Sequence, residues 1–69
     1  MRLSARNKIP ARVTGLAKGE ATANVELDAG GMRLVTSVTV EAANELGLVE
    51  GSEVIAVIKA SDVMLGFES

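Results

Sequence analysis

A hydroxyl, a guanidinium group and an amide lie close together near the start of the chain, in the run Ser4-Ala5-Arg6-Asn7. These side chains donate hydrogen bonds, and the planar fork of Arg6 matches the geometry of anionic oxygens. Short polar runs are also common at ordinary chain termini. The run therefore suits either an anion site or an ordinary polar terminus, and by itself it does not decide between them.

A second polar run, Lys59-Ala60-Ser61, follows the most apolar segment of the chain, residues 54–58. We expect Lys59 to be partly buried there, where an unpaired ammonium group is costly and requires an anionic partner. The partner is either the carboxylate of Asp62, in a purely structural pair, or a bound anion. The segment by itself favours neither.

Thr39 supplies a third candidate contact, because we expect it to cap the start of a short helix. A helix start exposes backbone N–H groups that favour an anion, although plain capping would also account for this threonine. The three segments together offer mostly hydrogen-bond donors, with positive charge from Arg6 and Lys59. That inventory suits a doubly charged oxyanion.

The composition gives little support to other functions. The chain has no His, Cys or Tyr, so the commonest catalytic bases and nucleophiles are missing and we predict no enzymatic activity. One Phe, no Trp and a net charge of −2 provide neither stacking surfaces nor a basic groove for nucleic acid. The glutamates between positions 41 and 53 are spread out, as on a solvated face, so we expect no bound metal ion other than an oxyanion.

Strands are the main elements that would position these residues. Alternating polarity, β-branched runs and glycine turns predict five strands, at residues 13–15, 20–28, 32–38, 54–58 and 63–67. A helix is predicted over Val40–Leu46, with Val40, Ala43 and Leu46 inward and Gly47 closing it. This order is that of an all-β, five-stranded OB-like barrel with one short helix between the third and fourth strands.

Chain size favours self-association. Sixty-nine residues form one domain, residues 1–69, with a marginal core, and neither disulfides nor a zinc site can reinforce it. Nevertheless 48% of the residues are apolar, more than so small an interior conceals. The apolar run at 54–58 should be covered on both faces, and a second subunit is one candidate cover.

The amino-terminal residues are charged where a signal peptide would become apolar, and no segment is long enough to span a bilayer. We therefore expect a cytoplasmic protein without a membrane partner. The acidic overall charge does not attract anions, so any anion site must be local.

The polar runs, together with several turns, resemble the molbindin or Mop family of small molybdate- and tungstate-binding proteins. The resemblance covers nearly the whole chain. It implies an OB-like fold and a homo-oligomer, a hexamer built as a trimer of dimers, with oxyanion sites at subunit interfaces. The matching runs are Ser4-Ala5-Arg6-Asn7, Lys18-Gly19, Glu45-Leu46-Gly47-Leu48 through Glu50-Gly51, and Val57-Ile58-Lys59-Ala60-Ser61-Asp62-Val63-Met64.

The resemblance also implies the residues of the site and the role of the protein. The ligand would be molybdate or tungstate, without a catalytic cofactor, and the role would be storage or buffering of that anion. A regulatory or scaffold oligomer, with molybdate as a signal to a partner protein, is the alternative. Some family domains carry a hydroxyl where Ala42 stands, so one hydrogen bond is missing here or comes from the backbone. The implied contacts are Ser4, Arg6, Thr39, Lys59, Ala60 and Ser61, with Ala5 and Asn7 in the same motif.

Overall fold

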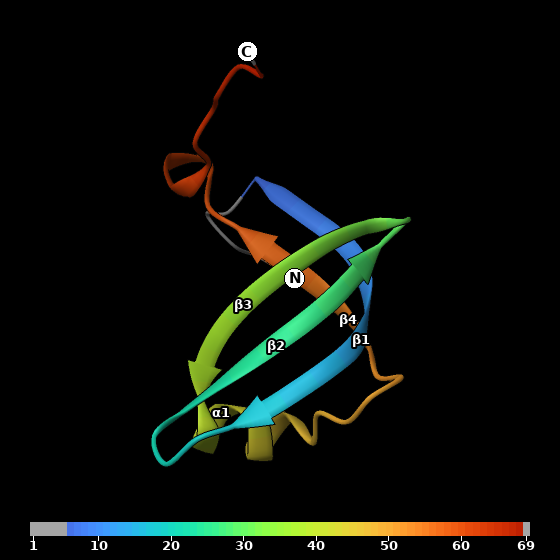
Figure 1. Cartoon of the computed structure of the whole chain (residues 1–69), viewed down its shortest axis with the longest axis vertical. Helices are drawn as coiled ribbons and strands as arrows, with labels where there is room; N and C mark the ends of the chain where they lie inside the picture. The colour runs from blue at the N-terminus through green and yellow to red at the C-terminus, as the bar shows by residue number, and fades with distance from the viewer. Residues whose placement is uncertain (1–5, 69) are drawn as a thin grey trace.

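The computed structural model describes residues 6–68, which form a curved antiparallel sheet of four strands with one short α-helix (Figure 1). The sheet order is β3-β2-β1-β4, so β3 and β4 are its two edges. The elements are β1 (Asn7–Lys18), β2 (Thr22–Ala29), β3 (Met32–Thr39), α1 (Val40–Leu46), β4 (Glu53–Ile58) and the 3-10 helix η1 (Ala60–Asp62).

The long strand β1 belongs to two ladders and gives the sheet its curvature. Residues 7–12 pair with β4, and residues 12–18 pair with β2. The register with β2 shifts between Val13 and Gly15, and a bulge of this kind bends a strand and increases its twist. Pro10 lies in the half of β1 that has no β2 partner, so its missing N–H leaves no gap in that ladder.

The predicted start of the first strand at Val13 is wrong. β1 begins at Asn7 and ends at Lys18, beyond the predicted end at Gly15. Alternating burial already starts at Asn7 and continues through Ile9 and Ala11. The proline interrupts the sequence pattern of a strand, but this part of β1 pairs with β4 alone, and there the proline does not interrupt the strand itself.

The core is small and comes mainly from β1 and β2. Val13 and Val25 are each 1% exposed and are its largest fully buried side chains, with Ala11 and Leu27 beside them. The predicted inward face of the second strand is confirmed at Ala23, Val25 and Leu27. Ala21, predicted on the same face, is exposed because it lies in the turn before β2.

The predicted helix is confirmed in its bounds and in both caps. Thr39 Oγ1 accepts a hydrogen bond from the Ala42 N–H at 3.0 Å, and Gly47 adopts the left-handed conformation with φ 64°. Ala43 is buried as predicted, but Leu46 is 71% exposed. Leu46 borders an open groove between β3 and β4, so the prediction that it faces a closed interior is wrong for this chain.

Gly47→Ala should lower the free energy of unfolding by about 1–2 kcal/mol, because an L-residue is disfavoured in the left-handed region. Urea unfolding followed by circular dichroism measures the change. Gly66→Ala is the matched control, since Gly66 has no positive φ and nothing within 4 Å of an added Cβ. Equal stability of the two variants would contradict the capping role of Gly47.

The predicted fifth strand is not formed. Residues 63–67 have no regular secondary structure, and after η1 the chain runs away from the sheet (Figure 1). A strand requires a partner edge for its backbone hydrogen bonds, and this segment lies along neither edge of its own sheet. The sheet consequently stays open between β3 and β4, and the closed five-stranded OB-like barrel is not confirmed.

Candidate functional site

The two polar runs meet at one end of the ladder between β1 and β4. Asn7 is the register partner of Ile58, and its side-chain Nδ2 donates to the Ile58 carbonyl at 3.2 Å. Arg6 directly precedes this pair and Lys59 directly follows it. The sheet therefore brings these two cations to the same end of the molecule, as the sequence suggested for the two runs.

Asn7 itself differs from the prediction, which placed it ahead of the first strand. It is the first residue of β1, and its amide ties the end of β4 to the start of β1. This hydrogen bond positions the neighbouring cations and uses one donor of the amide group. Ser4 and Ala5, predicted in the same motif, lie outside the described residues.

Lys59 is exposed, contrary to the predicted partial burial. Within residues 6–68 the only ion pair joins Arg33 to Glu26, so the structural pair between Lys59 and Asp62 is not formed. The reason is that β4 ends at Ile58 and the chain leaves the sheet there. Ala60 and Ser61, in η1, are also exposed, which leaves this run accessible to a ligand.

Thr39 lies at the opposite end of the sheet from Arg6 and Lys59. It pairs with Thr22 at the start of β2, beside the end of β1, whereas the cations lie beside the start of β1. Figure 1 shows the separation, with α1 and η1 at opposite ends of the molecule. One chain therefore does not bring Thr39 to the other predicted contacts.

The surroundings of Thr39 are acidic. A shallow depression beside it is lined by Glu20, Glu41, Glu45 and Asn44, among others. Carboxylates repel an anion, and the cation beside them, Lys18, donates from Nζ to Asn44 Oδ1 at 2.7 Å. Arg6 and Lys59 of the same chain lie at the other end of the sheet, so they do not reach this acidic surface.

The helix start offers fewer free amides than predicted. The Val40 N–H donates to the Ala21 carbonyl at 2.9 Å, and the Ala42 N–H donates to Thr39 Oγ1. The Ala42 amide therefore does not replace the hydroxyl that some family domains carry at this position. Because Thr39 Oγ1 is the acceptor in its cap, its own O–H remains a donor.

Residues 6–68, the part of the chain that the structure describes, contain no group of three or more His, Cys, Asp or Glu side chains able to hold a metal ion. Over the same residues, the structure has no helix both long and apolar enough to traverse a lipid bilayer. Arg6 and Lys59 are then the chemically distinctive groups at their end of the sheet, and both are free to approach an anion.

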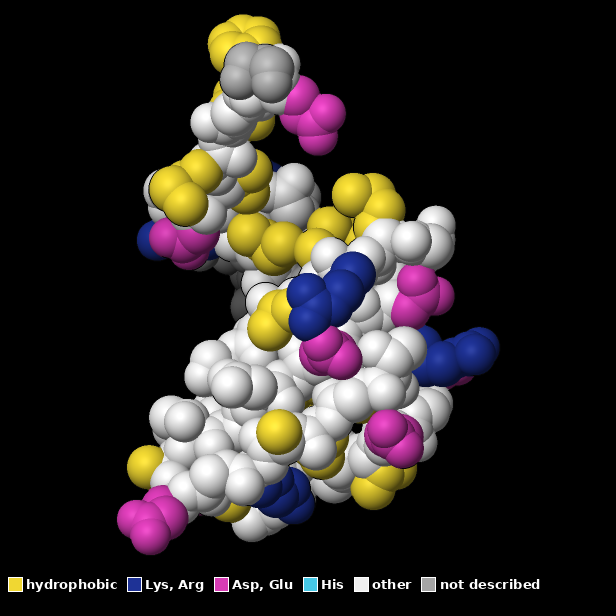
Figure 2. Space-filling view, viewed as in Figure 1, with side chains coloured by type: hydrophobic (Ala, Val, Ile, Leu, Met, Phe, Trp, Pro, Cys, Tyr) yellow, Lys and Arg dark blue, Asp and Glu magenta, His cyan; other side chains and the backbone are white. Residues whose placement is uncertain are grey.

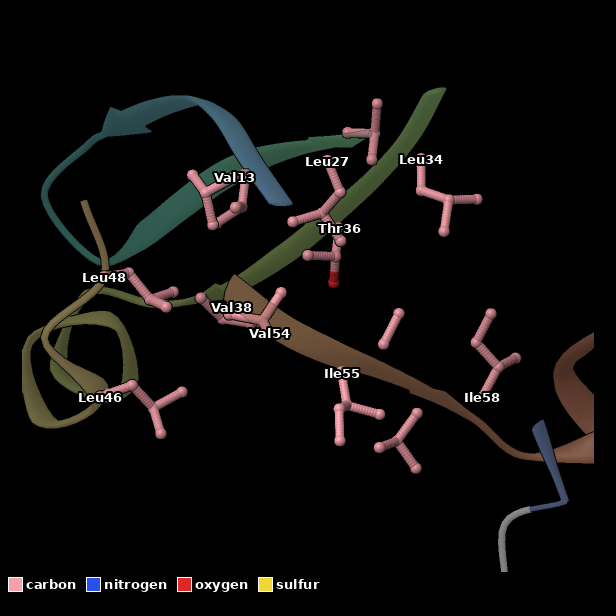
Figure 3. Close-up of a pocket in the computed structure, with 14 residues that line it drawn as sticks. Val13, Leu27, Leu34, Thr36, Val38, Leu46, Leu48, Val54, Ile55 and Ile58 are labelled. Carbon is pink, nitrogen blue, oxygen red and sulfur yellow. The ribbon is translucent and has the colours of Figure 1, made fainter. Parts of the chain in front are cut away.

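The structure also contains an apolar groove of about 310 Å³ between β3 and β4 (Figure 3). The alternate residues Ile55 and Val57 of β4 are 51% and 43% exposed, so this chain alone does not cover both faces of the strand as predicted. The position of this groove could not be predicted from the sequence. Its signals were the excess of apolar residues and the unbroken run at 54–58.

Comparison with known proteins identifies the family. The profile of the TOBE domain matches residues 3–65. Molybdenum-pterin-binding protein 1 of Clostridium pasteurianum is 46% identical over 66 residues, which cover 94% of this chain and 97% of that protein. The chain therefore belongs to the TOBE-domain family and, within it, to the molbindins that its motifs indicated.

Two solved structures share the fold. A molybdate-binding protein from Sporomusa ovata superposes with a TM-score of 0.93 at 34% identity, covering 97% of this chain and all of the other. The cytoplasmic molybdate-binding protein ModG, with molybdate bound, gives 0.92 at 45% identity, covering 99% of this chain and 49% of ModG. These relatives are named for binding a ligand and not for a reaction.

Proposed function

We propose that this chain binds molybdate, and tungstate by the same chemistry, at sites where two copies of the chain meet. The observation that carries the proposal is the separation of Thr39 from Arg6 and Lys59 at opposite ends of one sheet. If these residues serve one site, they must come from different subunits. The relatives named for molybdate or molybdenum supply the identity of the anion.

The proposed site holds the anion by charge and by hydrogen-bond donors. Arg6 and Lys59 neutralise its two negative charges. The hydroxyls of Ser4, Thr39 and Ser61 donate to its oxygens, and the backbone N–H groups of Ala5 and Ala60 add to them. Asn7 holds the strand ends in place through its bond to Ile58. The exposure of Arg6 and Lys59 supports this assignment, because neither cation is committed to an ion pair with another described residue.

A site made only of donors distinguishes between tetrahedral anions. Phosphate keeps a proton near neutral pH, and that O–H would have no acceptor, which costs the full desolvation of the group. Molybdate and tungstate carry no proton there, so every oxygen accepts. Sulfate is also unprotonated, and its exclusion therefore depends on the size of the cavity between subunits.

The role that follows is reversible storage or buffering of the oxyanion in the cytoplasm by a homo-oligomer, a hexamer built as a trimer of dimers. The site performs no reaction and requires no catalytic cofactor. The alternative is a regulatory or scaffold oligomer in which bound molybdate signals to a partner protein. A pull-down from extract with and without molybdate separates the two, because only the second role predicts a partner that depends on the anion.

Thr39→Asp tests the site apart from the fold. Aspartate caps a helix at least as well as threonine, so the unfolding free energy should stay within about 0.5 kcal/mol of the wild-type value. Molybdate affinity should fall at least about tenfold, because a donor to a charged ligand is lost and a negative charge is added. Isothermal titration calorimetry measures the affinity.

The control is Thr39→Ser, which keeps both the cap acceptor and the O–H donor and should bind molybdate nearly as the wild type does. Unchanged affinity in Thr39→Asp, with the helix intact, would remove Thr39 from the site.

A further inference from the structure

Lys18, the last residue of β1, lies at the end of the sheet that carries Thr39. It pairs in register with Ala23 of β2, and Ala23 pairs with Val38, the residue before Thr39. The end of β1 therefore lies close to the start of α1 (Figure 1). From there Lys18 Nζ donates to Asn44 Oδ1 of α1 at 2.7 Å, so its side chain is directed toward the helix.

The charge of Lys18 is not offset by a carboxylate of the described chain. Its hydrogen-bond partner is a neutral amide, and within residues 6–68 the only ion pair joins Arg33 to Glu26. An ammonium group has three N–H donors, so two of them remain beside Asn44. A group that keeps both its charge and its donors suits an anionic ligand.

Asn44 fixes where this ammonium group lies. It lines the same shallow depression as Thr39, whose O–H also remains a donor. Among residues 6–68, Lys18 is the only basic residue with a hydrogen bond to α1. The charged residues that line the depression are all acidic: Glu20, Glu41 and Glu45.

These carboxylates leave the charge of the proposed site unbalanced. Arg6 and Lys59 match the two charges of the anion, but each carboxylate around Thr39 repels it. The chain as a whole has a net charge of −2. On the face that Figure 2 shows, the basic side chains of the described residues are scattered among acidic ones without a continuous basic patch. Compensation must therefore come from a local cation, and Lys18 lies where one is required.

We propose that the Lys18 ammonium, oriented by Asn44, is a further contact of the oxyanion. One subunit then contributes Lys18 and Thr39 to a site, and another contributes Arg6 and Lys59. Asn44 is a positioning residue, because it holds the ammonium beside the depression without contacting the anion. The inference rests on the proposed function, since it adds a third cation to the same site.

The first test removes this charge. Lys18→Gln should weaken molybdate binding about tenfold or more, because a hydrogen bond from a charged group is lost. Lys18→Arg keeps the charge and the donors and should bind nearly as the wild type does. Isothermal titration calorimetry at fixed ionic strength measures the affinities, and circular dichroism confirms that each variant is folded.

The matched control is Arg12→Gln. It changes the net charge equally at an exposed residue that pairs with Asp28 and Glu53, away from Thr39, and it should bind molybdate as the wild type does. Wild-type affinity in Lys18→Gln, or an equal loss in Arg12→Gln, would overturn the contact.

Asn44→Ala separates contact with the anion from support of the helix. It removes the hydrogen bond between β1 and α1 but leaves the lysine charge, so affinity should fall less than in Lys18→Gln. An equal fall in both variants would overturn the contact, because Lys18 would then act only through α1.

Trace acetylation of wild-type protein gives a readout that needs no substitution. Molybdate should slow the acetylation of both Lys18 and Lys59, followed by peptide mass spectrometry, because the bound anion holds both ammonium groups. Phosphate at the same ionic strength is the control and should slow neither. Protection of Lys59 without protection of Lys18 would overturn this inference and leave the proposed function standing. Protection of neither, with no binding in calorimetry, would refute the proposed function itself.

Discussion

Arg6→Ala is expected to weaken molybdate binding by about 2–4 kcal/mol, which corresponds to roughly 30- to 1,000-fold in the dissociation constant. Removing one partner of a desolvated charge pair leaves the other charge uncompensated, and this is the main source of the loss. Arg6 lies beside Lys59 at the end of the ladder between β1 and β4. Lys59 alone then faces both charges of the anion. Isothermal titration calorimetry at fixed ionic strength measures the effect.

Arg12→Ala is the matched control for this variant. Arg12 is exposed like Arg6, but it lies within β1 and pairs in register with Asp28 and Glu53, away from the strand end that Arg6 precedes. The two variants change the net charge equally, so a difference between them reports position and not overall charge. Molybdate affinity at the wild-type level in Arg6→Ala would remove that residue from the site.

Molybdate should strongly stabilise the assembled protein against heat. A ligand that binds only the folded state, at 1,000 times its dissociation constant, adds about 4 kcal/mol. For domains of this size 1 kcal/mol corresponds to about 4–8 °C, so the melting temperature should rise by about 15–30 °C for one anion per chain. Differential scanning fluorimetry with an apolar-surface dye reports the shift, which suits a chain without Trp or Tyr.

Phosphate at the same concentration and ionic strength is the control for nonspecific salt effects, and it should give a much smaller rise. Arg6→Ala should lose most of the molybdate shift. An unchanged melting temperature at millimolar molybdate would contradict binding to the folded state.

The elements that local chemistry determines could be predicted from the sequence. A threonine acceptor before α1 and a glycine after it fix both ends of that helix, and strict alternation defines β2. Other features depend on distant pairing. The prediction starts β1 too late because Pro10 indicates a break in the strand. Pro10 fits within β1 because β2 does not pair with this part of the strand, and the sequence alone does not reveal which strands pair there.

The site was predictable in its chemistry but only partly in its geometry. The two polar runs lie together because Asn7 pairs with Ile58. Residue types alone do not determine this register of β1 against β4. The burial of Lys59 was predicted from the apolar run before it, but that run is half exposed in one chain. Likewise residues 63–67 have the composition of a strand, and a strand forms only where an edge accepts it. The departure at Lys59 lies at a surface where we propose that a second copy packs.

Native mass spectrometry of the protein with molybdate, tungstate, sulfate and phosphate in turn tests the central claim most directly, because it counts subunits and bound anions together. We predict an assembly of several chains, six in the proposed hexamer, that retains molybdate and tungstate but not phosphate. A single chain of 7.1 kDa without anions, or an assembly that retains phosphate as readily as molybdate, would contradict an oxyanion site built between subunits.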